Sequence, residues 1–228
     1  MPSKILLGIK SCNKRINFIK ACRETWVPAA SKFADVVFFV GNPQAGSSEV
    51  DDTVRLDVPD DYLGLPFKAV AMAQYSAERE YDVLWSVDDD TYAQPEYLED
   101  EVNSDYWGRL IPRTDPPYTS GFSRGLSRKA TQILAQVKAT CGYDDPFVGE
   151  VLHKEGISIL SSDRVILLPK VGGHKFLNFC GLPKNFLAAA ELLPDQMREL
   201  HKCVLEGRLR GDRLFVQTPR EKLPIALR

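Results

Sequence analysis

Val83-Leu84-Trp85-Ser86-Val87 runs directly into Asp88-Asp89-Asp90, and this stretch decides the fold. A short apolar run of β-branched and aromatic residues is typical of a strand that is buried on both faces. Such strands belong to parallel sheets that are covered by helices. Because ligands bind beyond the carboxyl ends of parallel strands, the three aspartates stand where a ligand site is expected.

The flanking sequence alternates between strand and helix patterns. Strands are predicted at 5–9, 35–40, 54–56, 83–87 and 165–168. Helices are predicted at 14–26, at 66–80, at 128–138 behind an N-cap at Ser127, and from 145 onward. A surface loop is predicted at 44–53, a short acidic helix after Pro95, and one or two helices between 181 and about 208. This order predicts an α/β fold with a mixed, mostly parallel central sheet flanked by helices.

The composition is that of an ordinary soluble globular chain. Of its 228 residues, 44% are hydrophobic and 26% are charged, and the formal net charge is −2. A slightly acidic chain lacks the basic face of a nucleic-acid-binding protein, so we expect no nucleic-acid partner. The apolar run at Ile5–Ile9 is too short for a membrane span or a signal peptide, which predicts a cytoplasmic protein with no membrane span. The five scattered cysteines form no CxxC pair and predict no zinc ribbon or disulfide framework.

The acidic triplet is the strongest candidate for a site. In an extended strand Asp88 and Asp90 point to one side and Asp89 points to the other. Two hard oxygen ligands on one side suit Mg²⁺ or Mn²⁺, which takes one or two carboxylates together with phosphates and waters. The alternative interpretation is a solvated acidic turn that follows a strand.

Two further segments carry candidate functional groups. Asp144-Asp145-Pro146 is typical of a helix start, and a purely capping role is one interpretation. A helix N-terminus also favours an ionised carboxylate, which is the form that a general base needs. His174 follows two glycines, and imidazole is a good Mn²⁺ ligand, although a lone loop histidine is commonly a surface residue.

An esterase is a remote alternative. Residues 121–125, GFSRG, match GxSxG, and Ser123, an aspartate at 144 or 145, and His174 follow the order of a hydrolase triad. However, Ser123 and Asp145 are only 22 positions apart and no HGGG-type loop lies upstream. No GxGxxG or P-loop motif occurs, so dinucleotide and P-loop binding are not supported.

Taken in order, these segments resemble the inverting glycosyltransferase family that contains Fringe and the β-1,3-galactosyl- and N-acetylglucosaminyltransferases. Residues 23–26, RETW, are similar to the family's RxTW, and residues 57–68 to its D-x-x-D-x-Y-x-x-L-x-x-K. Residues 85–92, WSVDDDTY, resemble the DDD strand, residues 118–127 resemble Y-x-S-G-x-G-Y-x-L-S, and residues 144–149 resemble EDVxxG. The resemblance covers about residues 4–176. It departs from the pattern at Ser86, Ser123 and Arg124, where the family has Lys, Gly and Tyr.

The resemblance implies the GT-A nucleotide-diphospho-sugar transferase fold, with a catalytic domain over 1–180 and a helical appendage over 181–228 packed on the same domain. It implies a metal-dependent transfer of a sugar from a UDP-sugar to a hydroxyl of a glycan or glycoprotein acceptor, with inversion. A retaining transferase on the same fold and an inactive carbohydrate-binding relative are the alternatives.

The resemblance also implies roles for individual residues. Asp145 would be the general base, and Asp90 and His174 would bind Mn²⁺ or Mg²⁺. The donor-binding residues would be Ile9, Lys10, Ser11, Arg15, Arg23, Lys68, Asp88 and Asp89. The substrate loop would contain Ser120, Gly121, Phe122 and Asp144.

Overall fold

The computed structural model describes residues 3–41, 48–112, 114–168, 170–171, 174–175, 181–207, 209–210 and 213–215. Among these residues the central feature is an eight-stranded mixed sheet with the order β3-β4-β2-β1-β5-β8-β7-β9. Its strands are β1 (Ile5–Lys10), β2 (Asp35–Gly41), β3 (Ser48–Val50), β4 (Thr53–Leu56), β5 (Val83–Asp88), β7 (Tyr106–Ile111), β8 (Tyr118–Ser127) and β9 (Ile159–Ser161). Strands β4, β2, β1 and β5 run parallel, whereas β8 is antiparallel to both β5 and β7.

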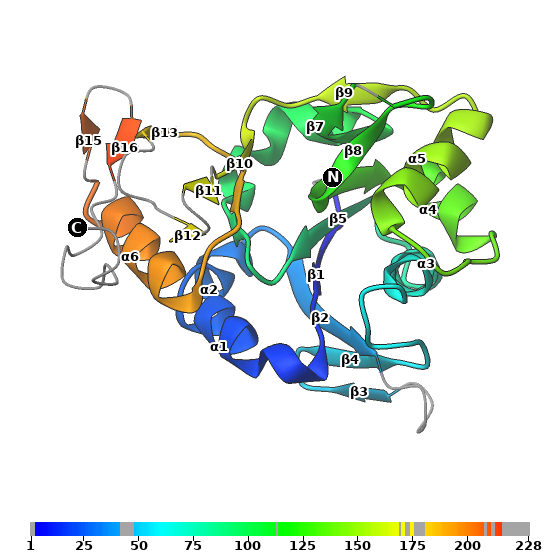
Figure 1. Ribbon diagram of the computed structural model, residues 1–228, viewed down its shortest axis with the longest axis horizontal. Helices are drawn as coiled ribbons and strands as arrows, with labels where there is room; N and C mark the ends of the chain where they lie inside the picture. The colour runs from blue at the N-terminus through cyan, green and yellow to red at the C-terminus, as the bar shows by residue number, and fades with distance from the viewer. Residues whose placement is uncertain are drawn as a thin grey trace.

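Helices cover both faces of this sheet (Figure 1). One face carries α1 (Ile16–Glu24), α2 (Val27–Ala30) and α6 (Pro194–Leu205), and the other carries α3 (Leu65–Glu78), α4 (Arg128–Ala135) and α5 (Asp144–Lys154). The apolar side chains form two clusters, one under each helical layer. The α/β class and the mostly parallel mixed sheet flanked by helices are therefore confirmed.

The central strands explain why the helices pack on both sides. Along β1, Leu7 and Ile9 lie in the cluster under α1 and α6, whereas Leu6 lies in the cluster under α3 and α4. Strand β5 divides its side chains in the same way, with Trp85 on one face and Leu84 on the other. Because successive side chains of a strand point to opposite faces, a continuous apolar run buries both faces of the sheet.

Smaller strands and 3₁₀ helices complete the fold. The 3₁₀ helices span Asn13–Arg15 and Pro95–Asn103. Strands β6 (Tyr92–Ala93), β10 (Val165–Leu167) and β14 (Ala188–Ala190) form one small sheet, and β11 (Lys170–Val171) pairs with β12 (His174–Lys175). A further sheet contains β13 (Gly181–Pro183), β15 (Leu209–Arg210) and β16 (Arg213–Phe215). No helix in the described part of the chain is long and apolar enough to cross a membrane.

Most of the predicted elements occur where the sequence indicates them, with three corrections. The predicted loop at 44–53 contains β3 and the start of β4, and the segment after Gly181 contains β13 and β14 before α6 begins. The N-cap of α5 is Tyr143, and the helix begins at Asp144, so the aspartate cap is wrong. The N-cap at Ser127 is confirmed, since its hydroxyl accepts a hydrogen bond of 3.3 Å from the amide of Ala130.

The contact between Trp85 and Trp107 determines how β8 sits in the sheet. Trp85 of β5 and Trp107 of β7 are both in register with Gly125 of β8, which lies between their strands. Their ring centroids are 5.6 Å apart, so the rings meet across the glycine. A Cβ atom at position 125 would overlap the indole of Trp107. Only a glycine leaves room for the two rings at this register.

We expect Gly125→Ala to destabilise the protein by about 1–3 kcal/mol, because an overpacked core must move rigid rings. Gly8→Ala in β1 is the matched control, since the Cβ atom there meets the flexible end of the Met72 side chain and comes no nearer than 3.1 Å to the Phe39 ring. Urea denaturation of both variants measures the difference. Equal losses of unfolding free energy would contradict this account of the tryptophan contact.

Candidate functional site

The acidic triplet lies at the carboxyl ends of the parallel strands β1 and β5. Lys10 and Asp88 are in-register partners at the ends of these two strands. Ser11 and Asp89 follow them, and the Ser11 hydroxyl donates a hydrogen bond of 2.5 Å to the Asp89 carboxylate. The carboxyl edge of a parallel sheet is where ligand sites form, so this edge is the candidate site.

Lys10 joins three elements at this edge. Its side chain is almost completely buried, and its Nζ lies 3.0 Å from Oδ1 of Asp88 and 2.8 Å from Oδ2 of Asp144. Nζ also donates a 3.0 Å hydrogen bond to the carbonyl oxygen of Gly121 in β8. Burial alone would lower the pKa of Lys10, but the charges of Asp144 and Asp88 raise it above its ordinary value. The ammonium group therefore stays charged and connects β1, β5, β8 and α5.

Arg124 is the second buried cation of the site. Only 2% of this residue is exposed, and its guanidinium forms an ion pair with the Asp144 carboxylate. Asp144 thus lies between two buried cations, Lys10 and Arg124. Burial opposes ionisation of Asp144, but the charges of Arg124 and Lys10 dominate and hold the pKa of this carboxyl well below its usual range.

Asp145 has the opposite electrostatic environment. Its carboxylate lies against Gly121, at the position that a side chain on that residue would occupy, and Nη1 of Arg124 is 4.0 Å away. Burial and the negative charge of Asp144 raise the pKa of Asp145 to about 6, although Arg124 partly opposes the rise. The side chain keeps 31% of its surface exposed. It is therefore an accessible carboxylate that can take up a proton near neutral pH.

Arg15 connects the other two aspartates of the triplet. It ends the first 3₁₀ helix, and its Nε donates to both oxygens of Asp89 at 2.7 and 2.9 Å. Its Nη2 lies 3.4 Å from Oδ2 of Asp90, which is a looser contact. The Arg15 side chain is 37% exposed, and its guanidinium stacks on Phe18, 3.7 Å from the centre of that ring.

The remaining residues predicted for donor binding (Ile9, Arg23, Lys68) and for the substrate loop (Ser120, Phe122) differ in where they lie. Lys68 is buried beside the site, where it donates to the carbonyl oxygen of Ser11 and pairs with Asp60 at 3.1 Å. Ile9 and Phe122 are core residues. Ser120 is half-buried in β8. Arg23 is not brought to this cluster, because its guanidinium pairs with Asp52 at the start of β4.

The histidine predicted as a metal ligand lies partly outside the described residues. The backbone of His174 belongs to β12, whereas its side chain is not described. Among the side chains that are described, no group of three or more His, Cys, Asp or Glu residues could hold a metal ion. The pairing of Asp90 with His174 stays a prediction.

Ser123 does not have the geometry of an esterase nucleophile. It lies within β8 rather than at a strand–helix turn, and it is fully buried. Its hydroxyl accepts a hydrogen bond of 3.0 Å from the Trp85 indole. An esterase needs its serine exposed on a sharp turn, so this position contradicts the esterase alternative.

Sequence reasoning assigned no role to Arg124. The available signal was an arginine inside a strand of small and apolar residues, 120–126. A charged side chain in a buried strand requires an opposite charge, so it predicts a buried carboxylate partner. The identity of that partner, Asp144, depends on how α5 packs on β8.

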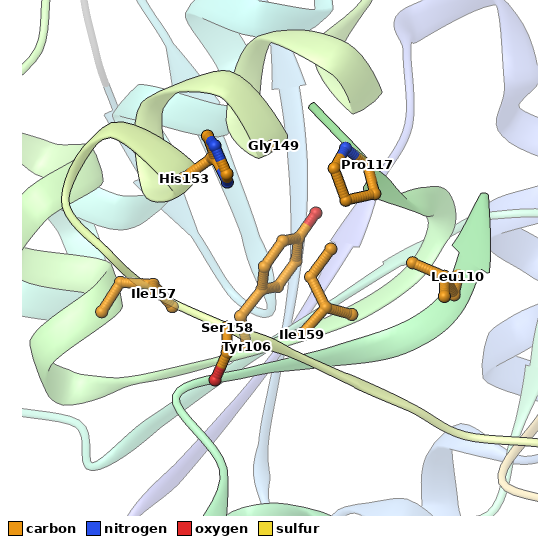
Figure 2. Close-up of a pocket in the computed structure, with 8 residues that line it drawn as sticks. All are labelled: Tyr106, Leu110, Pro117, Gly149, His153, Ile157, Ser158 and Ile159. Atoms are coloured by element: carbon orange, nitrogen blue, oxygen red, sulfur yellow. The ribbon is translucent and has the colours of Figure 1, made fainter. Parts of the chain in front are cut away.

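A pocket of about 280 Å³ lies between α5 and the strands β7 and β9 (Figure 2). It is lined by Tyr106, Leu110, Pro117, Gly149, His153, Ile157, Ser158 and Ile159. None of the predicted site residues lines it, and the Tyr106 hydroxyl is already hydrogen-bonded to Thr119. This pocket therefore lacks the charges that a nucleotide would need, and the acidic edge is the better candidate.

Comparison of the chain with protein-family models and with curated proteins finds no match. The interpretation of the site therefore depends on its own geometry and chemistry.

The two neighbouring carboxylates give opposite stability predictions. Asp145 has a raised pKa, so its ionisation costs stability as the pH rises from about 3.8 through about 6. Asp145→Asn should then stabilise the protein by about 1–2 kcal/mol above pH 7, a value that is reduced because the side chain is partly exposed. This gain should vanish below pH 4, where the carboxyl group is protonated in both the folded and the unfolded protein.

Asp144 has a lowered pKa and contributes stability above pH 3.8, which is lost as the pH falls further.

Asp144→Asn should accordingly destabilise the protein by about 3–5 kcal/mol at pH 7, because it leaves two buried cations without their carboxylate. Thermal unfolding of both variants between pH 4 and pH 8 measures the two effects. A shift of the same sign for both variants at pH 7 would contradict the assignment of charges.

Proposed function

We propose that this protein is a metal-dependent glycosyltransferase with a GT-A type fold, which moves a sugar from a UDP-sugar to a hydroxyl of a glycan acceptor with inversion. One observation carries the proposal. At the carboxyl edge of the parallel strands, an acidic triplet lies beside an accessible carboxylate, Asp145, whose pKa is raised to about 6. The ordered resemblance of residues 4–176 to the Fringe-containing family supports the same activity.

Asp145 is the general base in this proposal. Inverting transfer needs a group that removes the proton of the acceptor hydroxyl as that oxygen attacks the anomeric carbon. A carboxylate with a pKa of about 6 is mostly ionised at pH 7 and is a stronger base than an ordinary aspartate. Its position in the first turn of α5 adds the favourable field of a helix N-terminus.

The charged groups beside the triplet suit a diphosphate. Arg15 is partly exposed next to Asp89 and Asp90, and the positive charge of a guanidinium suits phosphate oxygens. Lys10 is too deeply buried to bind phosphate directly, and its role is to hold Asp88 and Asp144 in place. The phosphates would therefore lie on the Arg15 side of the triplet, with Asp145 on the other side.

Two carboxylates of the triplet could contribute ligands to a hard divalent cation, although the described side chains alone form no complete metal site. Asp88 and Asp90 offer carboxylate oxygens, and 38% and 21% of their side chains are exposed, so an ion from solvent can reach them. Mn²⁺ or Mg²⁺ typically takes one or two carboxylates together with phosphate oxygens and waters. Asp90 would hold the ion, with His174 as the second predicted protein ligand. When bound, the ion supplies positive charge that stabilises the departing diphosphate.

Asp145→Asn should lower the rate of sugar transfer by about 10²–10⁴-fold, because a positioned base contributes about that much. Binding of UDP should be unchanged, since the amide keeps the size of the carboxylate. Release of UDP from a panel of UDP-sugars, with Mn²⁺ and mixed glycan acceptors, measures the rate. Asp163→Asn, a change of an exposed aspartate in the turn after β9, is the control. Normal transfer by the Asp145 variant would exclude it as the base.

Asp90→Ala should weaken the Mn²⁺-dependent part of UDP binding by about tenfold or more, because a hard cation loses a carboxylate ligand. Titration calorimetry with UDP, in the presence of Mn²⁺ and of a chelator, separates the two contributions. Binding of UDP that is equally tight in both conditions for the unaltered protein would contradict the proposed metal dependence.

A further inference from the structure

Two exposed tyrosine rings lie next to each other at the rim of the acidic edge. Tyr62, between β4 and α3, is 67% exposed, and Tyr143, the N-cap of α5, is 60% exposed. Their ring centroids are 5.7 Å apart and the ring planes meet at 70°. Tyrosine rings that are this exposed contribute little to a hydrophobic core, so core packing does not explain why the two rings lie in contact.

The backbone beneath the rings is held in place on both sides. The amide of Gly142 donates a 3.1 Å hydrogen bond to the carbonyl oxygen of Leu63, which ties the two segments together. The Asp61 carboxylate accepts a 2.7 Å hydrogen bond from the amide of Gly64, where a larger residue would collide with Pro59. The rings are therefore presented by two turns that are hydrogen-bonded to each other, which lowers the entropic cost of ordering them around a ligand.

The pair also borders the candidate base. Tyr143 is two residues before Asp145, so its ring lies at the entrance to the first turn of α5. Partial burial, followed by the charges of Asp145 and Asp144, raises the pKa of the Tyr62 hydroxyl above its ordinary value. Because Tyr143 caps the helix whose first turn holds Asp145, and because the Tyr62 ring lies 5.7 Å from the Tyr143 ring, both tyrosines border this carboxylate.

Aromatic faces of this kind suit the apolar face of a pyranose ring. The π-face of tyrosine carries partial negative charge and attracts weakly positive C–H groups, while its hydroxyl can bind sugar hydroxyls. Tyrosine also offers a large and rigid contact surface at low entropic cost. We propose that Tyr62 and Tyr143 form the platform that binds the acceptor sugar and presents its hydroxyl to Asp145. This inference rests on the proposed transferase function.

The position of the pair favours an acceptor over the nucleobase of the donor. Arg15, the exposed cation suited to phosphate, contacts Asp89 and Asp90, whereas the tyrosines adjoin Asp145. The base must face the acceptor hydroxyl, so the protein surface next to Asp145 is expected to contact the acceptor. Stacking of the uracil ring on the same tyrosines is the competing occupant, and the test below separates the two.

The experiment compares Tyr62→Ala, Tyr143→Ala and the double variant with the unaltered full chain. Glycan-array binding in the presence of UDP and Mn²⁺ finds the best-bound glycan, and that glycan then serves as acceptor at graded concentrations. Each single variant should raise the acceptor KM by about tenfold, the typical effect of losing one aromatic contact, and the double variant should raise it further. The donor KM and the UDP dissociation constant should change by less than about twofold.

Two controls make this result specific. Tyr62→Phe and Tyr143→Phe keep the rings and should retain most of the binding. Phe33→Ala removes a ring that is 51% exposed just before β2, at the opposite edge of the sheet, and should have no effect. Unchanged Tm values in all the variants show that folding is intact.

Three results would overturn the platform. In the first, the double variant binds glycans as well as the unaltered chain does. In the second, the UDP dissociation constant rises while the acceptor KM does not, which identifies a nucleobase platform. In the third, the unaltered chain releases UDP from a UDP-sugar with Mn²⁺ but binds no glycan. That result would leave the proposed function in place and exclude the platform. Absence of both glycan binding and UDP release would overturn the proposed function as well.

Discussion

The site depends on one buried arrangement of charges, in which Asp144 lies between Lys10 and Arg124. Removing Asp144 would leave two buried cations without their carboxylate, which costs far more than the pairing itself contributes. The three residues come from β1, β8 and α5, so the ion pairs between them fix how α5 packs on the sheet. Two further positions at the acidic edge adjoin this arrangement, namely that of Asp88 beside Lys10 and that of Asp145 beside Gly121.

Asp144 and Asp145 are neighbours with opposite pKa shifts, and this difference follows from their partners. Asp144 has two cations in direct contact, whereas Asp145 is 4.0 Å from one of them and close to a like charge. Pairs of titratable groups with divergent pKa values are typical of sites that carry out acid–base chemistry. Asp145 combines a raised pKa with a partly exposed side chain, and the proposed role of general base rests on this combination.

The sheet was predictable because its signal is local. Ile5–Lys10 and Val83–Asp88 are apolar runs whose continuity fits a strand buried on both faces, and Ser127 is a strong local N-cap. The misassigned elements lack such local signals. Ala188–Ala190 has little strand propensity and is a strand because β6 and β10 pair with it. Tyr143 caps α5 although an aspartate follows, because the backbone path of the preceding turn decides where the helix begins.

By itself the sequence determined the α/β class, the alternation of its elements, and the location of Asp88–Asp90 at the end of a central strand. These follow from hydrophobic period and residue type, which act over a few neighbouring positions. Only the tertiary structure decided that Arg124 pairs with Asp144, that Arg23 turns toward Asp52, and that Tyr62 meets Tyr143 beside Asp145. The paired residues in these contacts are 20 or more positions apart along the chain. Charge pairing and ring contact act through space, so only the packing of the sheet and helices selects the partners.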